Sequence, residues 1–528
     1  MSPSETLTFN NSRGGSTEVL PMPLNEYAVT SNGFLPEEPP LRKLPNPYYG
    51  PWELLVESLP NALASRTLRD QVHQLPILST DRLTAEPEWR RACVILGFLA
   101  HAYIWGGDTA AETLPPQITL PFLAVTTHLG TPPVATFASL SLWNFEIAST
   151  STNTASTPSN TTPSTSVPDR DLDLTDPDAL RALHTFTGTA DESWFYMVSV
   201  AMEAEGARLL PVLLRAMHAL FAARDQDVPP ATTTAAAAAA VASRALGETT
   251  ACIGRLGRLL DRMDERCRPD VFYHQIRPFL AGSKNMEAAG LPRGVFYAES
   301  AEGEGEAEGK ANGKGEWRQL RGGSNGQSSL VQFLDIALGV EHIAMGSSNS
   351  SSGGGGSSSN SINSDPKEGG GGQGGKPAVG FHEEVRGYMP EPHRRFLEDV
   401  AARYPGGLRK GVEELLAAGG EGKGGLGPEL TEVREAFQTA TRALAEFRNK
   451  HLQMVTRYII IPSRQQNTRR EVNLATASSK LRASSSAEAK ETVPAGGGEL
   501  TGTGGTALMP FLKQTRDETF QAGRLEYR

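Results

Sequence analysis

The stretch that decides the fold is PELTEVREAFQTATRALAEFRNKHLQMVTRYIIIP, which runs from Pro428 to Pro462. Pro428 and Glu429 put a proline and an acid in the first turn of a helix, and Pro462 supplies the stop. Apolar side chains recur at spacings of three and four, so one stripe holds Phe437, Ala440, Leu444, Phe447, His451, Val455 and Tyr458. The spacing predicts a long helix over Pro428–Ile461, with His451 in the middle of its apolar face.

His451 on this face has two interpretations, because a buried imidazole needs a partner. It can be a core histidine that a backbone carbonyl or a water satisfies, and from pattern alone this is the more frequent case. It can also be the axial ligand of a haem, whose macrocycle would lie against the apolar stripe. Spacing alone does not separate the two.

Other segments of the chain also have helical spacing. Trp89–Trp105 is strongly apolar and of helix length, while Ala190–Leu220 and Gly322–His342 carry apolar residues three and four apart. Proline-set turns are expected at Leu44–Trp52 and Gly130–Val134. Because alternation with a period of two is scarce, the sequence predicts an all-α fold.

The chain has 528 residues, but five of its tracts are too poor in apolar residues to form a core. They are rich in Ser, Thr, Pro, Gly or Ala and cover 148–168, 227–240, 301–315, 346–375 and 478–498. Ordering them would cost about 1–2 kcal/mol of backbone entropy per residue with little burial in return. We expect them to be extended and poorly packed, which leaves a folded part of roughly 400 residues.

The tracts suggest how the chain is divided. We expect a tail over 1–40, a small helical domain over 41–147, a disordered linker over 148–169, a large helical domain over 170–465 with insertions at 227–240, 301–315 and 346–375, a disordered segment over 466–500, and a loop with a C-terminal helix over 501–528.

Charge and cysteine usage exclude several classes of protein. The formal net charge is −10 and no run of Lys and Arg forms a phosphate-binding stripe, so nucleic acid is not an expected partner. Cys93, Cys252 and Cys267 are scattered and odd in number, as in a reduced cytosolic protein. The start of the chain lacks an apolar signal region, and the longest strongly apolar run, Ala92–Ala100, is too short to span a bilayer. We expect a soluble cytoplasmic protein without membrane contact.

Seven blocks of sequence resemble the indoleamine 2,3-dioxygenase family, in the family's order. They are LPNPYYGPWELL (44–55), LGTPPVATFASLSLWN (129–144), WFYMVSVAMEAEGA (194–207), VFYHQIRPFLAGSKN (271–285), LRGGSNGQSSLVQFLDIALGVEH (320–342), RNKHLQMVTRYIIIP (448–462) and GTGGTALMPFLK (502–513). Together they cover most of the chain outside the five tracts. The resemblance is to a fungal-type member with low-complexity insertions, and it implies a two-domain helical fold whose larger, C-terminal domain binds haem b.

The resemblance implies roles for residues on the two sides of the haem. His451 is the implied proximal iron ligand, Arg448 the partner of a haem propionate, and Asp335 the residue that fixes this arginine. Gly323 and Ser324 border the pocket above the haem edge. The ordinary alternatives are a solvated charge for Arg448 and an exposed carboxylate for Asp335.

For the substrate side, the resemblance implies a pocket that holds an indole amino acid. Phe272 packs on the indole, Arg277 holds the carboxylate, and Thr503 in a mobile GTGGT loop closes over the substrate. The distal pocket is lined by Phe195, Tyr196, Ser199 and Phe137, the last at a position where some members carry Tyr. Without the resemblance, such aromatic residues are ordinary core, and Arg277 before Pro278 is a cap or surface charge.

Other motifs in the sequence are weak. GTGGT has no preceding strand and no G-x-G-x-x-G, and RGGSNGQSS lacks the GK[ST] ending of a phosphate loop. The remaining histidines show no HExxH or clustered carboxylate spacing, so a non-haem metal centre has no support.

The expected function is cleavage of the indole C2–C3 bond of L-tryptophan, or of another indoleamine, with O₂ to give N-formylkynurenine, the first step of the kynurenine pathway. The cofactor carries this chemistry, while the protein orients the substrate and excludes water. We expect a monomer that depends on an unidentified electron donor. The alternatives are a non-catalytic homologue that senses haem or oxygen, and a helical scaffold without a cofactor.

Overall fold

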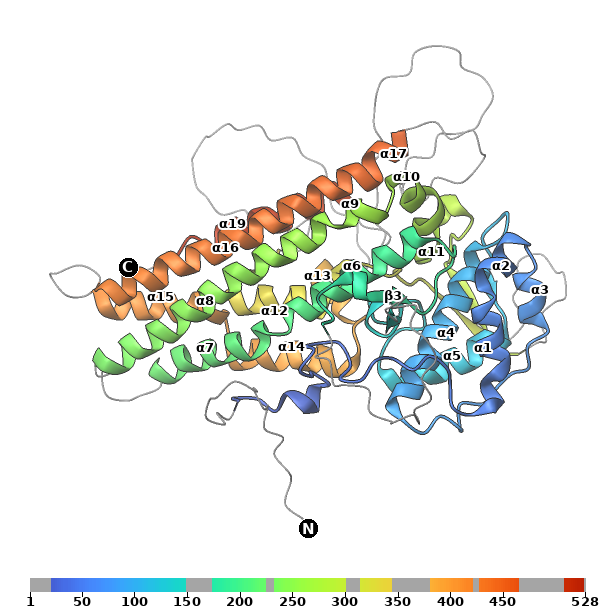
Figure 1. The fold of residues 1–528 in the computed structure, drawn as a ribbon, viewed down its shortest axis with the longest axis horizontal. Helices are drawn as coiled ribbons and strands as arrows, with labels where there is room; N and C mark the ends of the chain where they lie inside the picture. The colour runs from blue at the N-terminus through green and yellow to red at the C-terminus, as the bar shows by residue number, and fades with distance from the viewer. Residues whose placement is uncertain are drawn as a thin grey trace, which may run out of the picture.

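The computed structural model describes residues 20–148, 173–224, 232–300, 314–343, 380–420, 427–464 and 508–526. Long helices gather at one end of the molecule and shorter helices at the other, as Figure 1 shows. The described residues are mostly helical, with two small sheets, which confirms the predicted helical class.

The first part of the described chain consists of short helices around one long one. Its elements are η1 (Leu24–Tyr27), η2 (Pro47–Tyr49), α1 (Gly50–Glu57), α2 (Leu59–Ala64), α3 (Leu68–His73), α4 (Glu86–Trp105), β1 (Thr113–Leu114), α5 (Pro116–Leu129), η3 (Ala138–Leu142) and β2 (Phe145–Ile147). Helix α4 is the apolar segment that the sequence predicted, and its residues from Arg91 to Ile104 are buried. The predicted turn at Gly130 is left-handed, with φ of +64°.

The middle part carries the elements that surround the candidate site. They are η4 (Pro177–Ala179), β3 (Leu180–Ala182), α6 (Ala190–Gly206), α7 (Leu209–Arg224), α8 (Thr232–Asp261), α9 (Met263–Arg266), α10 (Pro269–Val271), η5 (Phe272–Ile276), α11 (Arg277–Leu280), η6 (Glu287–Ala289), β4 (Val295–Ala298), β5 (Gly315–Arg318), η7 (Asn325–Gln327) and α12 (Ser329–Leu338). The predicted helix over Ala190–Leu220 is thus two helices, α6 and α7. Gly206 at the break packs so closely that an added Cβ would lie 2.2 Å from Leu330 Cδ2.

The last part contains the long helix α16 and several shorter helices. Its elements are α13 (Phe381–Arg386), α14 (Glu391–Arg403), α15 (Gly407–Gly420), α16 (Pro428–Val455), η8 (Thr456–Ile460), α17 (Ile461–Arg464) and α19 (Leu508–Ala522). Helices α8 and α19 both pack along α16 (Figure 1).

Two sheets and two hydrophobic clusters complete the fold. Strand β4 pairs in parallel with β1 and antiparallel with β5, while β2 pairs antiparallel with β3. One cluster is centred on α4 and also contains Val198, Phe272 and Tyr458. The other holds the facing sides of α7, α8, α12, α14, α15 and α16. Among the described helices, none is both long and apolar enough to cross a membrane.

Two expectations from the sequence are wrong in part. Residues 232–240 are not an extended insertion but the start of α8, with Ala238 and Ala239 buried, since alanine has the highest helix propensity. Pro462 does not stop the α16 helix, which continues to Arg464 through the wider turn η8. A π-helical turn loosens the regular hydrogen-bond ladder, so a residue without an N–H is accommodated there.

Several expectations fall outside the described residues. These are Thr503, the tracts over 346–375 and 478–498, the segment over 466–500, residues 1–19 of the tail, and most of the linker over 148–169 and of the insertion over 301–315.

Candidate active site

A cavity of about 270 Å³ lies where α6, α8, α12, α16 and α19 meet the short elements η3, η5 and η7. Its wall includes ten of the residues that the sequence singled out: Phe137, Phe195, Tyr196, Ser199, Phe272, Arg277, Gly323, Ser324, Arg448 and His451. Asp335 lies behind the wall, where it contacts Arg448. The chain therefore brings side chains from distant segments to one mainly apolar cavity.

Three π-helical turns border this cavity. They are η3, η5 and η8, and they contribute Leu140, Phe272 and Tyr458 to its wall. Such turns are rare and occur frequently at functional sites, because the extra residue changes where the side chains on either side point. The turn η5 ends directly before Arg277 and so sets the position of this arginine.

His451 projects from α16 into the cavity, which accounts for the part of its surface that is exposed. Its ring nitrogens make no hydrogen bond with any residue in the described part of the chain. Burial, and then the charge of Arg448, lower the pKa of His451 to about 4. The ring is therefore neutral at physiological pH, with a lone pair available to a metal on the cavity side.

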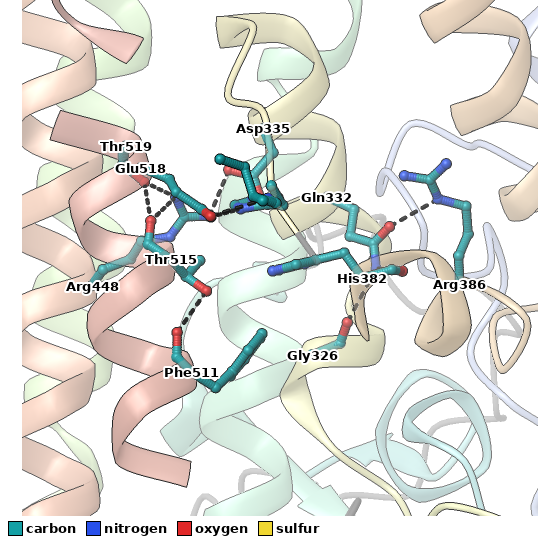
Figure 2. A network of polar contacts seen from close by, with 12 residues as sticks. Gly326, Gln332, Asp335, His382, Arg386, Arg448, Phe511, Thr515, Glu518 and Thr519 are labelled. Carbon is teal, nitrogen blue, oxygen red and sulfur yellow. Dashed lines mark hydrogen bonds and ion pairs between the residues drawn. The ribbon is translucent and has the colours of Figure 1, made fainter. Parts of the chain in front are cut away.

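Arg448, one turn before His451, is buried and held by neighbours on two helices. Its guanidinium donates to Asp335 Oδ1 on α12 at 2.5 Å, and to Thr519 Oγ1 on α19. Although burial alone would raise the pKa of Asp335, the charges of Arg448 and His342 hold it well below its usual range. Figure 2 shows these side chains coming together from the three helices α12, α16 and α19.

The network continues through His342, which bridges two carboxylates. Its ring nitrogens lie 3.2 Å from Asp335 Oδ2 and 2.6 Å from Glu518 Oε2. Burial opposes the charged form, but hydrogen bonds to Asp335 and Glu518 raise the pKa of His342 to about 9. His342 is therefore a cation near neutral pH and draws α19 towards α12.

His382 stacks on this cation, with ring centroids 3.8 Å apart and an angle of 12° between the planes. Burial and the charge of His342 lower the pKa of His382 to about 3, so it is neutral. Donor atoms of Asp335, His342 and His382 lie within 4.8 Å of one another, the spacing of a possible metal site. Two nearly parallel rings cannot direct lone pairs at one ion, however, so this group is an imidazolium stacked on an imidazole.

The aromatic part of the wall is built from three rings in contact. Phe272 lies with its ring centroid 4.9 Å from that of Phe195 and 5.7 Å from that of Tyr458. Tyr196 is 1% exposed, and its hydroxyl donates to Glu192 Oε1 at 2.9 Å. Within the described residues, Ser199 Oγ makes only a long contact of 3.4 Å with the Phe195 carbonyl. Tyr196 is therefore a ring surface of the wall, whose hydroxyl is already engaged.

Arg277 brings a buried positive charge to this apolar wall. It is 3% exposed and lines the cavity, with its guanidinium carbon 5.7 Å from the centroid of the Tyr273 ring. Burial lowers the pKa of Arg277 to about 10, while Tyr273 acts in the opposite direction. Arginine remains charged at neutral pH, so the cavity is suited to a ligand that combines a flat apolar body with an anionic group.

The glycine-rich turn forms another part of the wall. Its backbone approaches η3 so closely that glycine is required at 323. A Cβ on Gly323 would lie 2.3 Å from Leu140 Cδ1, so a side chain there would displace the η3 wall. Ser324 caps η7 by accepting from the Gly326 amide at 3.2 Å. The Phe137 amide donates to Gln327 Oε1 at 2.8 Å, which ties η3 to the same turn.

Glu203 is a residue of the cavity wall that the sequence did not predict, although it lies within the family-like block over 194–207. It is buried, lines the cavity, and accepts from Ser328 Oγ at 2.5 Å. Burial raises the pKa of Glu203 to about 7, against the effect of Ser328. The contact links α6 to the start of α12, where a carboxylate is favourable. No local pattern could reveal it, because the two residues are 125 positions apart.

Helix α19 was expected but not as part of the cavity wall. It contributes Leu508, Phe511, Leu512 and Thr515, and the first three of these belong to the same block, 502–513, that carries Thr503. Thr503 itself lies outside the described residues, so its predicted closure over a substrate stays a prediction.

Comparison with known proteins gives a consistent family. A family model described as indoleamine 2,3-dioxygenase matches residues 23–522. An indoleamine 2,3-dioxygenase of Penicillium citrinum is 35% identical over 504 residues, which cover 94% of this chain and 88% of the relative. One of Saccharomyces cerevisiae is 33% identical over 510 residues, covering 95% and 94%. A 6-hydroxytryptophan 2,3-dioxygenase of Fusarium equiseti is 32% identical over 500 residues, covering 94% and 97%.

Proposed function

We propose, because the chain belongs to the indoleamine 2,3-dioxygenase family, that it cleaves the C2–C3 bond of L-tryptophan with O₂ to give N-formylkynurenine. The observation that supports this proposal is that His451 and Arg277 both line one mainly apolar cavity. The first is a neutral imidazole that makes no hydrogen bond within the described residues, and the second is a buried cation.

The residues around the cavity fit haem b, the cofactor that the family implies. A ring nitrogen of His451 would ligate the iron, and its neutral state suits this role. Arg448, oriented by Asp335, would meet a propionate, and the apolar wall would cover the macrocycle. When bound in the ferrous state, haem supplies the activation of O₂.

The protein's own part in the reaction is to bind and orient the substrate. Arg277 would hold the substrate carboxylate through charge-assisted hydrogen bonds, and Phe272 would pack on the indole. Phe195, Phe137 and the ring of Tyr196 would exclude water from the reacting bond. These contacts would hold the substrate in one orientation, which lowers the entropy cost of reaching the transition state.

The border of the pocket would be shaped by residues whose main contribution is steric. Gly323 allows the backbone to approach η3, Ser324 holds the η7 turn, and Ser199 offers a small polar side chain. Thr503 would close over bound substrate. We assign no protein base, because the cofactor chemistry proposed here does not need one.

The choice of substrate is the finer part of the proposal. One relative is named for 6-hydroxytryptophan, so ring-hydroxylated tryptophan is the substrate to compare with L-tryptophan. We also propose a cytoplasmic location, a monomer, a separate electron donor, and a small N-terminal domain followed by a large haem-binding domain. The clusters around α4 and around α16 support this division, although the first takes residues from both parts of the chain.

The direct test is to purify the protein with haem, add a reductant and L-tryptophan, and measure N-formylkynurenine. We expect steady turnover, with 6-hydroxytryptophan tested alongside. A haem-loaded protein that forms neither N-formylkynurenine from L-tryptophan nor its ring-hydroxylated counterpart from 6-hydroxytryptophan would be the non-catalytic sensor instead. A protein that binds no haem would be the scaffold.

A further inference from the structure

His101 is a buried histidine of α4 that lies outside the cavity wall and has no part in the function proposed above. It is 1% exposed, and both of its ring nitrogens are bonded to backbone groups. Nδ1 lies 2.6 Å from the Phe279 carbonyl oxygen, and Nε2 lies 3.0 Å from the Ala135 amide nitrogen. Since a carbonyl only accepts and an amide N–H only donates, the ring must carry its proton on Nδ1 and a lone pair on Nε2.

This single tautomer is stable because the ring stays neutral. Burial lowers the pKa of His101 to about 4, although the bond to the Phe279 carbonyl acts in the opposite direction. A doubly protonated ring could not accept from the Ala135 amide. His101 is therefore a fixed bridge across the physiological pH range.

The bridge joins two parts of the cavity wall. Phe279 lies two residues after Arg277 in α11, and Ala135 lies two residues before Phe137. One turn further along α4, Trp105 Nε1 donates to the Ala281 carbonyl at 2.9 Å. Helix α4 thus satisfies carbonyls at the C-terminal end of α11, where a helix leaves acceptors without internal partners.

The same region also contacts the glycine-rich turn. A Cβ on Gly282 would lie 2.3 Å from the Gly322 amide nitrogen, and one on Gly323 would lie 3.3 Å from the Ala135 carbonyl oxygen. The loop before Ala135 is held from its other side, because the Tyr297 hydroxyl donates to the Pro133 carbonyl at 2.7 Å. The residues after α11 and the loop over 131–137 therefore both contact the glycine-rich turn, and His101 bridges α11 to this loop.

We propose that His101 is a positioning residue, which sets the place of Arg277 relative to Phe137 and so the seating of the substrate carboxylate. The proposal rests on the substrate role given to Arg277 above. His101 touches neither the cavity nor the proposed cofactor site, so its effect is transmitted through α11 and the loop over 131–137. Because the substrate would make the carboxylate contact already on binding, a misplaced Arg277 should raise KM more than it lowers kcat.

The test compares three variants of the full-length haem protein. His101→Phe keeps the ring size but loses both hydrogen bonds, and we expect it to raise KM for L-tryptophan about ten-fold with a smaller change in kcat. His101→Gln carries a donor and an acceptor on one amide and should recover part of this loss. Trp105→Phe removes only the bond to Ala281 and is the matched control, with a smaller change in KM.

Tryptamine, which lacks the carboxylate, distinguishes the proposed positioning role of His101 from a merely structural one. For His101→Phe, the loss of kcat/KM should be much larger for L-tryptophan than for tryptamine. Equal losses for the two compounds, or an unchanged KM for L-tryptophan, would overturn the proposal. If His101→Phe does not fold, His101→Asn replaces it, because its short amide can reach Phe279 but not Ala135. His101→Asn should then have a higher KM than His101→Gln, and equal values contradict the proposal.

Failure of the proposed function remains distinguishable. The affinity of the ferric haem protein for L-tryptophan, followed by its absorption spectrum, needs no turnover. If the wild type binds L-tryptophan without forming N-formylkynurenine, the proposed reaction fails, while a weaker affinity of His101→Phe still supports the positioning role. If the wild type does not bind L-tryptophan, both proposals fail.

Discussion

Arg448 and Asp335 form a buried ion pair at 2.5 Å that joins α16 to α12 beside the cavity (Figure 2). The two residues are separated by 113 positions in the chain, and both are less than 10% exposed. Arg448 lies one helical turn before His451, so the pair couples the orientation of α16 near His451 to the position of α12.

Asp335→Asn should destabilise the protein strongly, because it leaves a buried guanidinium without its counter-charge. Losing one partner of a buried pair costs roughly 3–5 kcal/mol. We expect a lower free energy of unfolding in chemical denaturation, together with reduced haem content. The matched control is Asp261→Asn. It breaks the exposed pair between Asp261 on α8 and Lys450, which lies on α16 like Arg448. This control should cost about 1 kcal/mol or less. Equal effects of the two variants would contradict the coupling role.

Because of His342, the free energy of unfolding should decrease at alkaline pH. Its pKa is about 9 in the folded protein against an ordinary value of 6.5, so its contribution is fully present below pH 6.5 and is lost as the pH rises through 9. We expect the free energy of unfolding to fall by about 3 kcal/mol between pH 6.5 and 9.5, because each pKa unit between the unfolded and folded values corresponds to about 1.4 kcal/mol. His342→Gln should flatten this slope in urea titrations. A wild-type slope retained by the variant would assign the titration to another group.

Gly323→Ala should disturb the pocket more than its neighbour Gly326→Ala. The added Cβ at 323 would meet Leu140 Cδ1 at 2.3 Å, whereas at 326 the nearest atoms lie at 3.5 Å. Overpacking of this kind costs about 1–3 kcal/mol. We expect lower thermal stability and weaker L-tryptophan binding for Gly323→Ala. Wild-type behaviour of Gly323→Ala would mean that η3 can move without consequence.

Arg277→Leu should separate substrate binding from haem binding. A charge-assisted contact is worth about 1.5–3 kcal/mol, so its loss should weaken engagement of L-tryptophan by roughly ten- to a hundred-fold. Binding of haem and of carbon monoxide should be retained. The loss should be smaller for an indole without a carboxylate, measured as kcat/KM. Unchanged tryptophan turnover would remove the carboxylate role from Arg277.

Local patterns in the sequence account for much of this structure. The caps and stripe of α16 predict its start and the direction of His451, because both depend on residues within a few turns. The same reasoning gives the wrong result at 232–240, because a run of alanine resembles a low-complexity tract although alanine favours helix.

Other parts of the site could not be predicted from local patterns. The bridges made by His101 and Glu203 join segments more than 30 and 120 residues apart, and neither carries a local signal. The same holds for Asp335, whose burial depends on Arg448 and His342 reaching it from other elements.

The central claim is that His451 holds haem in this cavity, and the absorption spectrum of purified His451→Ala tests it most directly. The matched control is His128→Ala, which removes an exposed imidazole that lies against Trp89. We predict that the Soret band disappears in His451→Ala while the control matches the wild type, with both variants folded by circular dichroism. Full haem occupancy and an unchanged spectrum in His451→Ala would contradict the assignment.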